Sequence, residues 1–322
     1  MMTSMEIVTK QDNAAIVGSS LSSTLVADWL NYNADKSPAT VKTYAAALKN
    51  FFGWLADNNV TVPRREHVIA YRDLFCTSKK VSTARLYLSA VKVFSKWLAS
   101  IGAYLDFAAG VTTPTLNEEA ETHVREALTL DEAKAVLNSF TGKRDVKSLR
   151  DALIMRIMLN CGLRSIEIVR LDATDIERRH GKIYLLVWGK GRKGKTARVE
   201  ISRTIFNMIQ DYLNLRGSKR MKGEPMFVST ANRNFGQRLQ TQSISRLAKR
   251  TLRVVGIDSE TVTCHSCRHF FATELLNQGV DLRTIQRLMR HRNSSTTEIY
   301  LSDRKMRNDT SVLMLSALLD VA

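Results

Sequence analysis

The hydrophobic period of the sequence changes between residues 182 and 201. Two runs of β-branched and apolar residues, KIYLLVW and ARVEI, flank the segment GKGRKGKT. Short runs of this composition on either side of a glycine-rich segment predict a β-hairpin, here with a long basic tip. The segments around the hairpin have helical periodicity, so residues 125–305 are predicted to form a mainly α domain with a small antiparallel sheet.

The first part of the chain predicts helices. Ser37 and Pro38 suit the N-cap and first position of a helix over 37–58, whose apolar residues recur at spacings of three and four. Residues 81–102 have a similar stripe, and 67–75 predict a shorter helix. We therefore expect a helical domain over residues 21–107, preceded by a flexible arm over residues 1–20.

Periodicity is lost over residues 108–124, which contain Pro114, and this segment is the predicted linker. Thr129 and Glu132 then form a capping-box pattern at the start of the second domain. Its helices include VKSLRDALIMRIMLN, which stops at Gly162, and basic segments such as SISRLAKRTLR. Residues 306–322 form a tail with an apolar end.

The charge is unevenly distributed. The chain has 48 Lys and Arg against 31 Asp and Glu, a net charge of +17, and residues 121–322 hold 36 of the basic and 21 of the acidic residues. Such an excess favours a polyanionic partner, although a solvated basic surface is the alternative. No apolar run of membrane-spanning length and no signal pattern is present, so we expect no membrane partner and a cytoplasmic location.

The segment CHSCRH has the residue types of a metal or redox site. Cys264, Cys267 and His269 would need a fourth ligand, and Cys76 and Cys161 each stand alone, so a zinc site has little support. A redox Cys-x-x-Cys pair is typical of a strand followed by a helix, which is not the pattern here. We expect no metal.

The same segment has the features of an anion site. His265 and Arg268 lie three residues apart at the start of the predicted helix SCRHFFATELLNQG. A helix N-terminus favours anions, and an arginine fork binds two phosphate oxygens. We therefore interpret CHSCRH as an anion-binding segment in which the thiols have no chemical role.

Three more segments carry candidate residues. In CGLRSIE, Arg164 follows the glycine that ends a helix, and Glu167 is placed to form a salt bridge with it. Lys190 lies in the basic hairpin tip. In LMRHRNSSTTEIY, His291 and Tyr300 are nine residues apart. Considered separately, His291 could be a helix-capping histidine, Tyr300 an ordinary buried tyrosine, and the loop with Lys190 a solvated basic loop.

The motifs GLRSIE, VWGKGRK, HSCRHFFAT and LMRHRNSSTTEIY occur in this order, and together they resemble the tyrosine recombinase, or phage integrase, family. The family includes Xer recombinases and the integrases of phages and transposons. The resemblance covers residues 125–305, while residues 21–107 resemble more weakly the family's SAM-like core-binding domain. It implies a site-specific recombinase that cleaves and rejoins DNA through a 3′-phosphotyrosine intermediate.

The resemblance assigns roles to the candidate residues. Tyr300 would attack the scissile phosphate, His265 would assist movement of its proton, and Lys190 would protonate the leaving 5′-oxygen. Arg164 and Arg268 would hold the non-bridging oxygens. The resemblance further implies that His291 donates a hydrogen bond to the phosphate and that Glu167 supports Arg164. Other residues of the basic tip would contact the DNA backbone, namely Arg192, Lys193 and Lys195. It implies no cofactor and no metal.

Two positions depart from the family pattern. Cys267 stands where leucine is commoner, and Arg290 stands where glycine is usual before His291. Neither removes a catalytic group. Arg290 places an additional positive charge beside the site, for which the sequence offers no explanation.

The resemblance also implies partners: double-stranded DNA with specific recombination sites, a homotetramer formed through docking of residues 306–322 on a neighbour, and accessory DNA-bending proteins. The tail folding back on its own domain is the alternative. The reaction on a mobile element or chromosome would be integration, excision, inversion or dimer resolution. Alternative functions are a type IB topoisomerase-like DNA-relaxing enzyme and a non-catalytic DNA-binding protein on the same fold.

Overall fold

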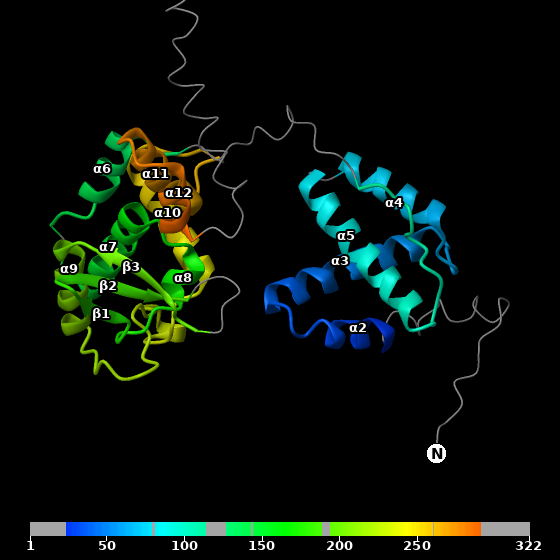
Figure 1. Cartoon of the computed structure of the whole chain (residues 1–322), viewed down its shortest axis with the longest axis horizontal. Helices are drawn as coiled ribbons and strands as arrows, with labels where there is room; N and C mark the ends of the chain where they lie inside the picture. The colour runs from blue at the N-terminus through cyan, green and yellow to red at the C-terminus, as the bar shows by residue number, and fades with distance from the viewer. Residues whose placement is uncertain are drawn as a thin grey trace, which may run out of the picture. The chain divides into compact units, whose positions relative to one another are not determined.

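A computed structural model describes residues 24–78, 81–113, 127–142, 144–188, 194–259 and 261–290. The chain divides into two compact units, Met1–Thr122 and His123–Ala322 (Figure 1). Both units are built mainly from helices, and the second contains a three-stranded antiparallel sheet. The predicted fold class is confirmed. None of the described helices is long and apolar enough to cross a membrane.

In the described residues of the first unit, four helices pack around an aromatic core. They are α2 (Val26–Tyr32), α3 (Pro38–Asp57), α4 (Arg65–Ser78) and α5 (Val81–Ser100). As predicted, the Ser37 side chain caps α3 by accepting a hydrogen bond from the Thr40 backbone N–H. The rings of Phe51 and Phe94 are fully buried where α3 packs on α5. Helix α2 was not predicted, because it spans only seven residues and buries one side chain, that of Trp29.

The core of this unit extends beyond the predicted boundary at residue 107. Ala108 and Val111 are 1% and 2% exposed and belong to the hydrophobic core. The Lys92 ammonium also donates a hydrogen bond to the Val111 carbonyl at 2.6 Å. The hydrophobic core of the first unit therefore continues into the first residues of the segment that the sequence predicts to be a linker. Residues 114–126, and the predicted arm over residues 1–20, lie outside the described residues.

The second unit is organised around α7 (Val146–Cys161), in which most residues between Arg150 and Cys161 are buried, as expected for a central helix. Helix α11 (Cys264–Asn277) and α9 (Arg203–Leu215) both pack against it. Figure 1 shows α11 and α12 (Leu282–Met289) on one side of α7 and the sheet on the other. The remaining helices are α6 (Leu130–Asn138), α8 (Ser165–Val169), the 3₁₀ helix η2 (Asn232–Asn234) and α10 (Thr241–Val254).

The sheet has the order β1 (Ile176–Arg179), β2 (Lys182–Val187) and β3 (Ala197–Ile201). Leu185 of β2 pairs with Ile176 on one side and Val199 on the other, which confirms the predicted hairpin. The strand β1 was not predicted. Its sequence IERR carries charges at three of four positions, as is common on an exposed edge strand but contrary to the usual strand composition.

Candidate active site

Arg164 and Glu167 form the first part of the site, at the junction between α7 and α8. Gly162 ends α7 with a left-handed backbone, at φ 57° and ψ 31°. The chain then turns so that Arg164 occupies the N-cap of α8, and its backbone N–H donates to Glu167 Oε2 at 2.8 Å. The Arg164 guanidinium donates to Glu167 Oε1 at 3.0 Å. The salt bridge expected from the sequence is therefore present.

Arg268 reaches the same carboxylate from α11. Thr263 caps this helix by accepting a hydrogen bond from the His265 backbone N–H, and Ser266 completes a capping box. Arg268 is 5% exposed, and its guanidinium donates to the carbonyl oxygens of Gly162 and Met289. Its Nη1 atom lies 3.9 Å from Glu167 Oε2. The packing of α11 on α7 thus brings Arg268 beside Arg164 across about a hundred residues of sequence.

A third arginine, which sequence reasoning did not assign to the site, contacts Glu167. Arg290 follows α12, and its Nη2 atom donates to Glu167 Oε2 at 2.9 Å. The sequence feature that could have indicated this contact is the arginine itself, at a position where the family pattern has glycine. One buried carboxylate therefore lies among three guanidinium groups, so the cluster is net positive.

The protonation state of Glu167 follows from these contacts. Burial raises the pKa of this carboxyl, but the hydrogen bond and charge of Arg290, with the backbone N–H and charge of Arg164, outweigh burial and hold the pKa below its ordinary value. A lowered pKa in the folded state means that the ionised carboxylate stabilises the fold at neutral pH, and this contribution is lost as the pH falls through the folded-state pKa. Glu167 is accordingly an anion at neutral pH.

The remaining residues of CHSCRH are placed on the first turn of α11. His265 is half-buried and lies three residues before Arg268 on this helix. Cys267 is fully buried, and burial raises the pKa of its thiol to about 12. Cys264 Sγ lies 3.4 Å from Ser165 Oγ and 3.6 Å from Ser245 Oγ. In the part of the chain that the structure describes, no group of three or more His, Cys, Asp or Glu side chains is arranged to hold a metal ion.

Several predicted site residues lie outside the described residues: Lys190, Arg192, Lys193, His291 and Tyr300. Lys195 is described, and its ammonium forms ion pairs at 2.5 Å with both Asp172 and Asp175. A contact between Lys195 and the DNA backbone stays a prediction, and it would compete with these ion pairs for the charge of the ammonium.

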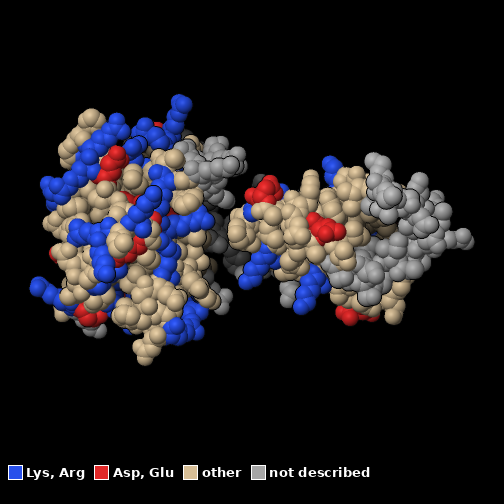
Figure 2. All heavy atoms as spheres, turned by 90° about the horizontal axis from the view of Figure 1, so that it is seen from below, with Lys and Arg blue, Asp and Glu red and all other residues tan. Residues whose placement is uncertain are grey.

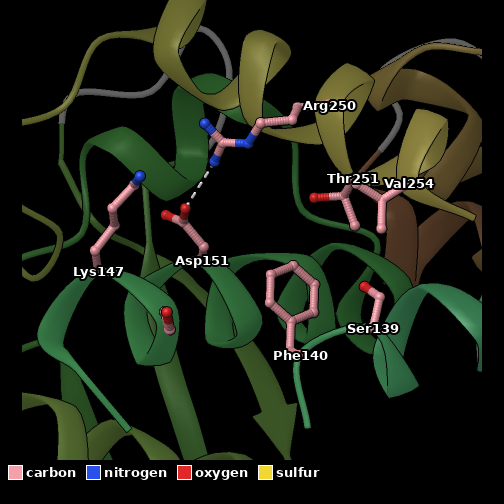
Figure 3. A pocket seen from close by; sticks show the side chains of 8 residues that line it. Ser139, Phe140, Lys147, Asp151, Arg250, Thr251 and Val254 are labelled. Carbon is pink, nitrogen blue, oxygen red and sulfur yellow. Dashed lines mark hydrogen bonds and ion pairs between the residues drawn. The ribbon is translucent and has the colours of Figure 1, made fainter. Parts of the chain in front are cut away.

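A separate cavity of about 280 Å³ lies between the start of α7 and the end of α10. In Figure 3 Asp151 and Arg250 point toward each other across it, with Lys147 at one side and Phe140 at the other. The Asp151 carboxylate accepts from Arg250 at 2.9 Å and from Arg150 at 2.7 Å. The ion pair between Arg250 and Asp151 joins α10 to α7, so we interpret the cavity as the edge of a structural contact.

The glycine between α7 and α8 gives a test of this geometry. A Cβ atom on Gly162 would lie 2.5 Å from Phe271 Cδ1, and the backbone there has positive φ. We expect Gly162→Ala to lower the free energy of unfolding by roughly 2–5 kcal/mol, from left-handed strain and overpacking together. Urea denaturation followed by circular dichroism would measure the loss.

Gly181→Ala is the matched control. Gly181 also has positive φ, at 75°, but a Cβ atom there would meet nothing within 4 Å. Its replacement should cost only about 1–2 kcal/mol, from backbone strain alone. Equal losses in the two variants would contradict the close packing of α11 against the Arg164 turn.

Comparison with known proteins gives consistent matches along the chain. The family model described as "Phage integrase family" matches residues 126–307, and "Phage integrase, N-terminal SAM-like domain" matches residues 27–102. The tyrosine recombinase XerC of Caldanaerobacter subterraneus subsp. tengcongensis is 32% identical over 304 residues, covering 86% of this chain and 82% of the relative. XerC of Serratia marcescens is 27% identical over 277 residues, covering 84% and 86%.

Solved structures share the fold. The XerH site-specific recombinase bound to palindromic difH substrate, in a post-cleavage complex, aligns with a TM-score of 0.75 at 19% identity, covering 97% of this chain and 91% of that chain. A lambda integrase tetramer bound to a Holliday junction aligns with a TM-score of 0.62 at 16% identity, covering 86% and 76%. The likeness of fold therefore includes both units.

Proposed function

Because the chain belongs to the phage integrase family, and is a site-specific tyrosine recombinase that cleaves and rejoins DNA, we propose that Arg164 and Arg268 bind the scissile phosphate. One observation carries this assignment. Guanidinium groups from two different elements, α8 and α11, converge on the single buried carboxylate of Glu167. Burying cations together is unfavourable unless anions compensate them, so a second anion beside Glu167 is expected to bind there.

The proposed chemistry is a transesterification. The Tyr300 oxygen attacks phosphorus, the bond from phosphorus to the 5′-oxygen breaks, and the energy of the phosphodiester is retained in a 3′-phosphotyrosine. His265 assists removal of the phenolic proton, and Lys190 gives a proton to the leaving oxygen. A 5′-hydroxyl of the partner strand then attacks the phosphotyrosine and releases Tyr300. The sequence positions of His291 and Tyr300 in the family motif support their inclusion.

The arginines supply electrostatic stabilisation. Negative charge develops on the non-bridging oxygens as the phosphorus becomes five-coordinate, and cations already fixed in position stabilise that charge without reorganising. Arg268 is held by two carbonyl groups and Arg164 by Glu167. Both guanidinium groups are therefore positioned before DNA arrives.

The surface of the second unit supports DNA binding. Figure 2 shows Lys and Arg side chains gathered on the visible face of this unit and more sparsely on the first. Helix α10 presents exposed cations at Arg246, Lys249 and Arg253, and its Arg250 is anchored to Asp151. We propose that these basic side chains of the second unit contact DNA phosphates, since such contacts supply most of the salt-dependent affinity of DNA-binding proteins.

We propose a homotetramer on two DNA duplexes, with residues 306–322 docking on a neighbouring protomer. The lambda integrase structure is described as a tetramer on a Holliday junction, which supports this assembly. Accessory DNA-bending proteins and a cytoplasmic location, where the DNA substrate lies, stay predictions. The topoisomerase-like alternative is not favoured, because the SAM-like domain model matches residues 27–102 and the XerC relative covers 86% of this chain.

A paired-site plasmid assay tests this function. Supercoiled plasmids would carry one or two copies of DNA flanking the gene, and products would be separated with and without detergent and protease. We expect recombinant circles only from the two-site plasmid, with a protein–DNA adduct that survives detergent. Relaxation of both plasmids without recombinants would support the topoisomerase alternative, and DNA binding without any adduct would support a non-catalytic protein.

A further inference from the structure

Arg290 has a backbone conformation that its side chain does not favour. It lies at φ 55° and ψ 43°, directly after the last residue of α12. This left-handed region favours glycine, and an L-residue there costs free energy. An arginine at this position therefore indicates that its side chain makes compensating contacts.

Those contacts are made with the arginine cluster. Arg290 Nη2 donates to Glu167 Oε2 at 2.9 Å, and its Nε donates to Glu167 Oε1 at 3.3 Å, so the guanidinium engages both oxygens as a fork. Its Nη2 atom also lies 3.4 Å from the Gly162 carbonyl oxygen, which accepts from Arg268 as well. The Arg290 side chain is only 11% exposed, and its Nη1 atom donates to the Leu288 carbonyl oxygen at 2.7 Å, so each guanidinium nitrogen has a partner within the protein.

The two hydrogen bonds from Arg290 reduce the attraction of the Glu167 carboxylate for Arg164 and Arg268. Arg164 contacts only one oxygen of Glu167 through its side chain and remains 21% exposed. Arg268 stays 3.9 Å from the carboxylate and donates to the carbonyl groups of Gly162 and Met289. Without Arg290, the carboxylate would lose a side chain that donates to both of its oxygens. Its charge would then draw Arg164 and Arg268 inward and weaken the positive potential at the phosphate position.

We propose that Arg290 is a positioning residue for DNA cleavage: it engages both oxygens of Glu167 and thereby keeps Arg164 and Arg268 oriented for the scissile phosphate. This inference rests on the proposed phosphate-binding role of Arg164 and Arg268. It also accounts for the departure from glycine at this position. The unfavourable backbone conformation of Arg290 is offset by three charge-assisted hydrogen bonds to Glu167 and to the Gly162 carbonyl group.

Single-turnover cleavage of a nicked suicide substrate, at saturating DNA, measures this role. We expect Arg290→Gly to slow formation of the covalent adduct roughly 10- to 100-fold, because displaced catalytic groups cost rates of this order. Arg290→Lys should restore only part of the rate, since an ammonium supplies charge but no planar fork. Glycine suits the left-handed backbone, but the loss of a partner of buried Glu167 should lower the melting temperature. Cleavage is therefore compared at a temperature well below the melting temperature of each variant.

A double-mutant cycle separates positioning from direct contact. If Arg290 acts through Glu167, then adding Arg290→Gly to Glu167→Gln should change the rate by less than about twofold. The dissociation constant for DNA and its dependence on salt should match the wild type, because Arg290 does not contact a phosphate. A wild-type rate for Arg290→Gly, an undiminished defect in the Glu167→Gln background, or a salt slope lowered by about one unit would overturn the proposal.

The same experiment distinguishes this inference from the proposed function. If the wild-type chain forms no adduct, or if Tyr300→Phe still forms one, the proposed function fails whatever Arg290 does. If the wild type forms the adduct through Tyr300 and Arg290→Gly reacts equally fast, only the role of Arg290 is refuted.

Discussion

Replacing Tyr300 with phenylalanine is expected to abolish covalent attachment to DNA and leave DNA affinity within about twofold of the wild type. The phenolic oxygen forms the bond to phosphorus, so its removal leaves no nucleophile at that position. Phenylalanine keeps the aromatic ring and removes only the hydroxyl group. Denaturing gels of a labelled nicked suicide substrate would detect the adduct, and gel-shift titration would report binding.

Tyr184→Phe is the matched control for this prediction. Tyr184 lies in β2, paired with Glu177 and Glu200 on the neighbouring strands, and its hydroxyl has no role in the proposed reaction. This variant should form the adduct at the wild-type rate. Adduct formation by Tyr300→Phe would show that a different residue attacks the phosphate.

Replacing Arg164 with alanine is expected to slow cleavage by about 10²- to 10³-fold, the usual cost of removing one fixed donor to a developing anion. Arg164 is a sharper test than Arg268. Arg268 is almost fully buried and donates to two carbonyl groups, so its removal would also destabilise the fold. Arg164 is partly exposed, and its loss leaves Glu167 paired with Arg290.

Single-turnover cleavage and thermal melting would be measured together for the Arg164 variants. Arg164→Lys should recover part of the rate, since it keeps the charge but loses the fork. Arg203→Ala removes an exposed arginine from the first turn of α9, outside the Glu167 cluster, and should cleave at the wild-type rate. Cleavage by Arg164→Ala within threefold of the wild type would exclude a role for this guanidinium at the phosphate.

Local parts of the site were predictable from sequence, because they depend on helix spacing. Arg164 and Glu167 are three residues apart at a helix start, and His265 and Arg268 occupy the first turns of another helix. Both arrangements follow from a glycine or a capping residue next to an apolar stripe.

Contacts between distant segments were not predictable in the same way. The approach of Arg268 to Glu167 depends on how α11 packs on α7, and the contact of Arg290 with Glu167 spans 123 residues. The ion pairs of Lys195 with Asp172 and Asp175 likewise depend on the register of the sheet. A sequence pattern indicates which face of a helix or strand is buried. It does not indicate which distant side chains meet there, because tertiary packing determines those contacts.

Two segments differ from their local sequence pattern for a similar reason. Residues 108–112 lack periodicity, yet Ala108 and Val111 are buried because a short irregular segment can complete a core without forming a helix. The strand β1 forms because its backbone pairs with β2, although its side chains are mostly charged. In both segments tertiary contacts outweigh local propensity.

The most direct measurement is an experimental structure of the chain trapped covalently on a nicked DNA substrate. The account predicts Tyr300 bonded to phosphorus, with guanidinium nitrogens of Arg164 and Arg268 within about 3 Å of the non-bridging oxygens, and with Glu167 still held by Arg290. A phosphate bound away from these two arginines in every protomer, or joined to another residue, would contradict it.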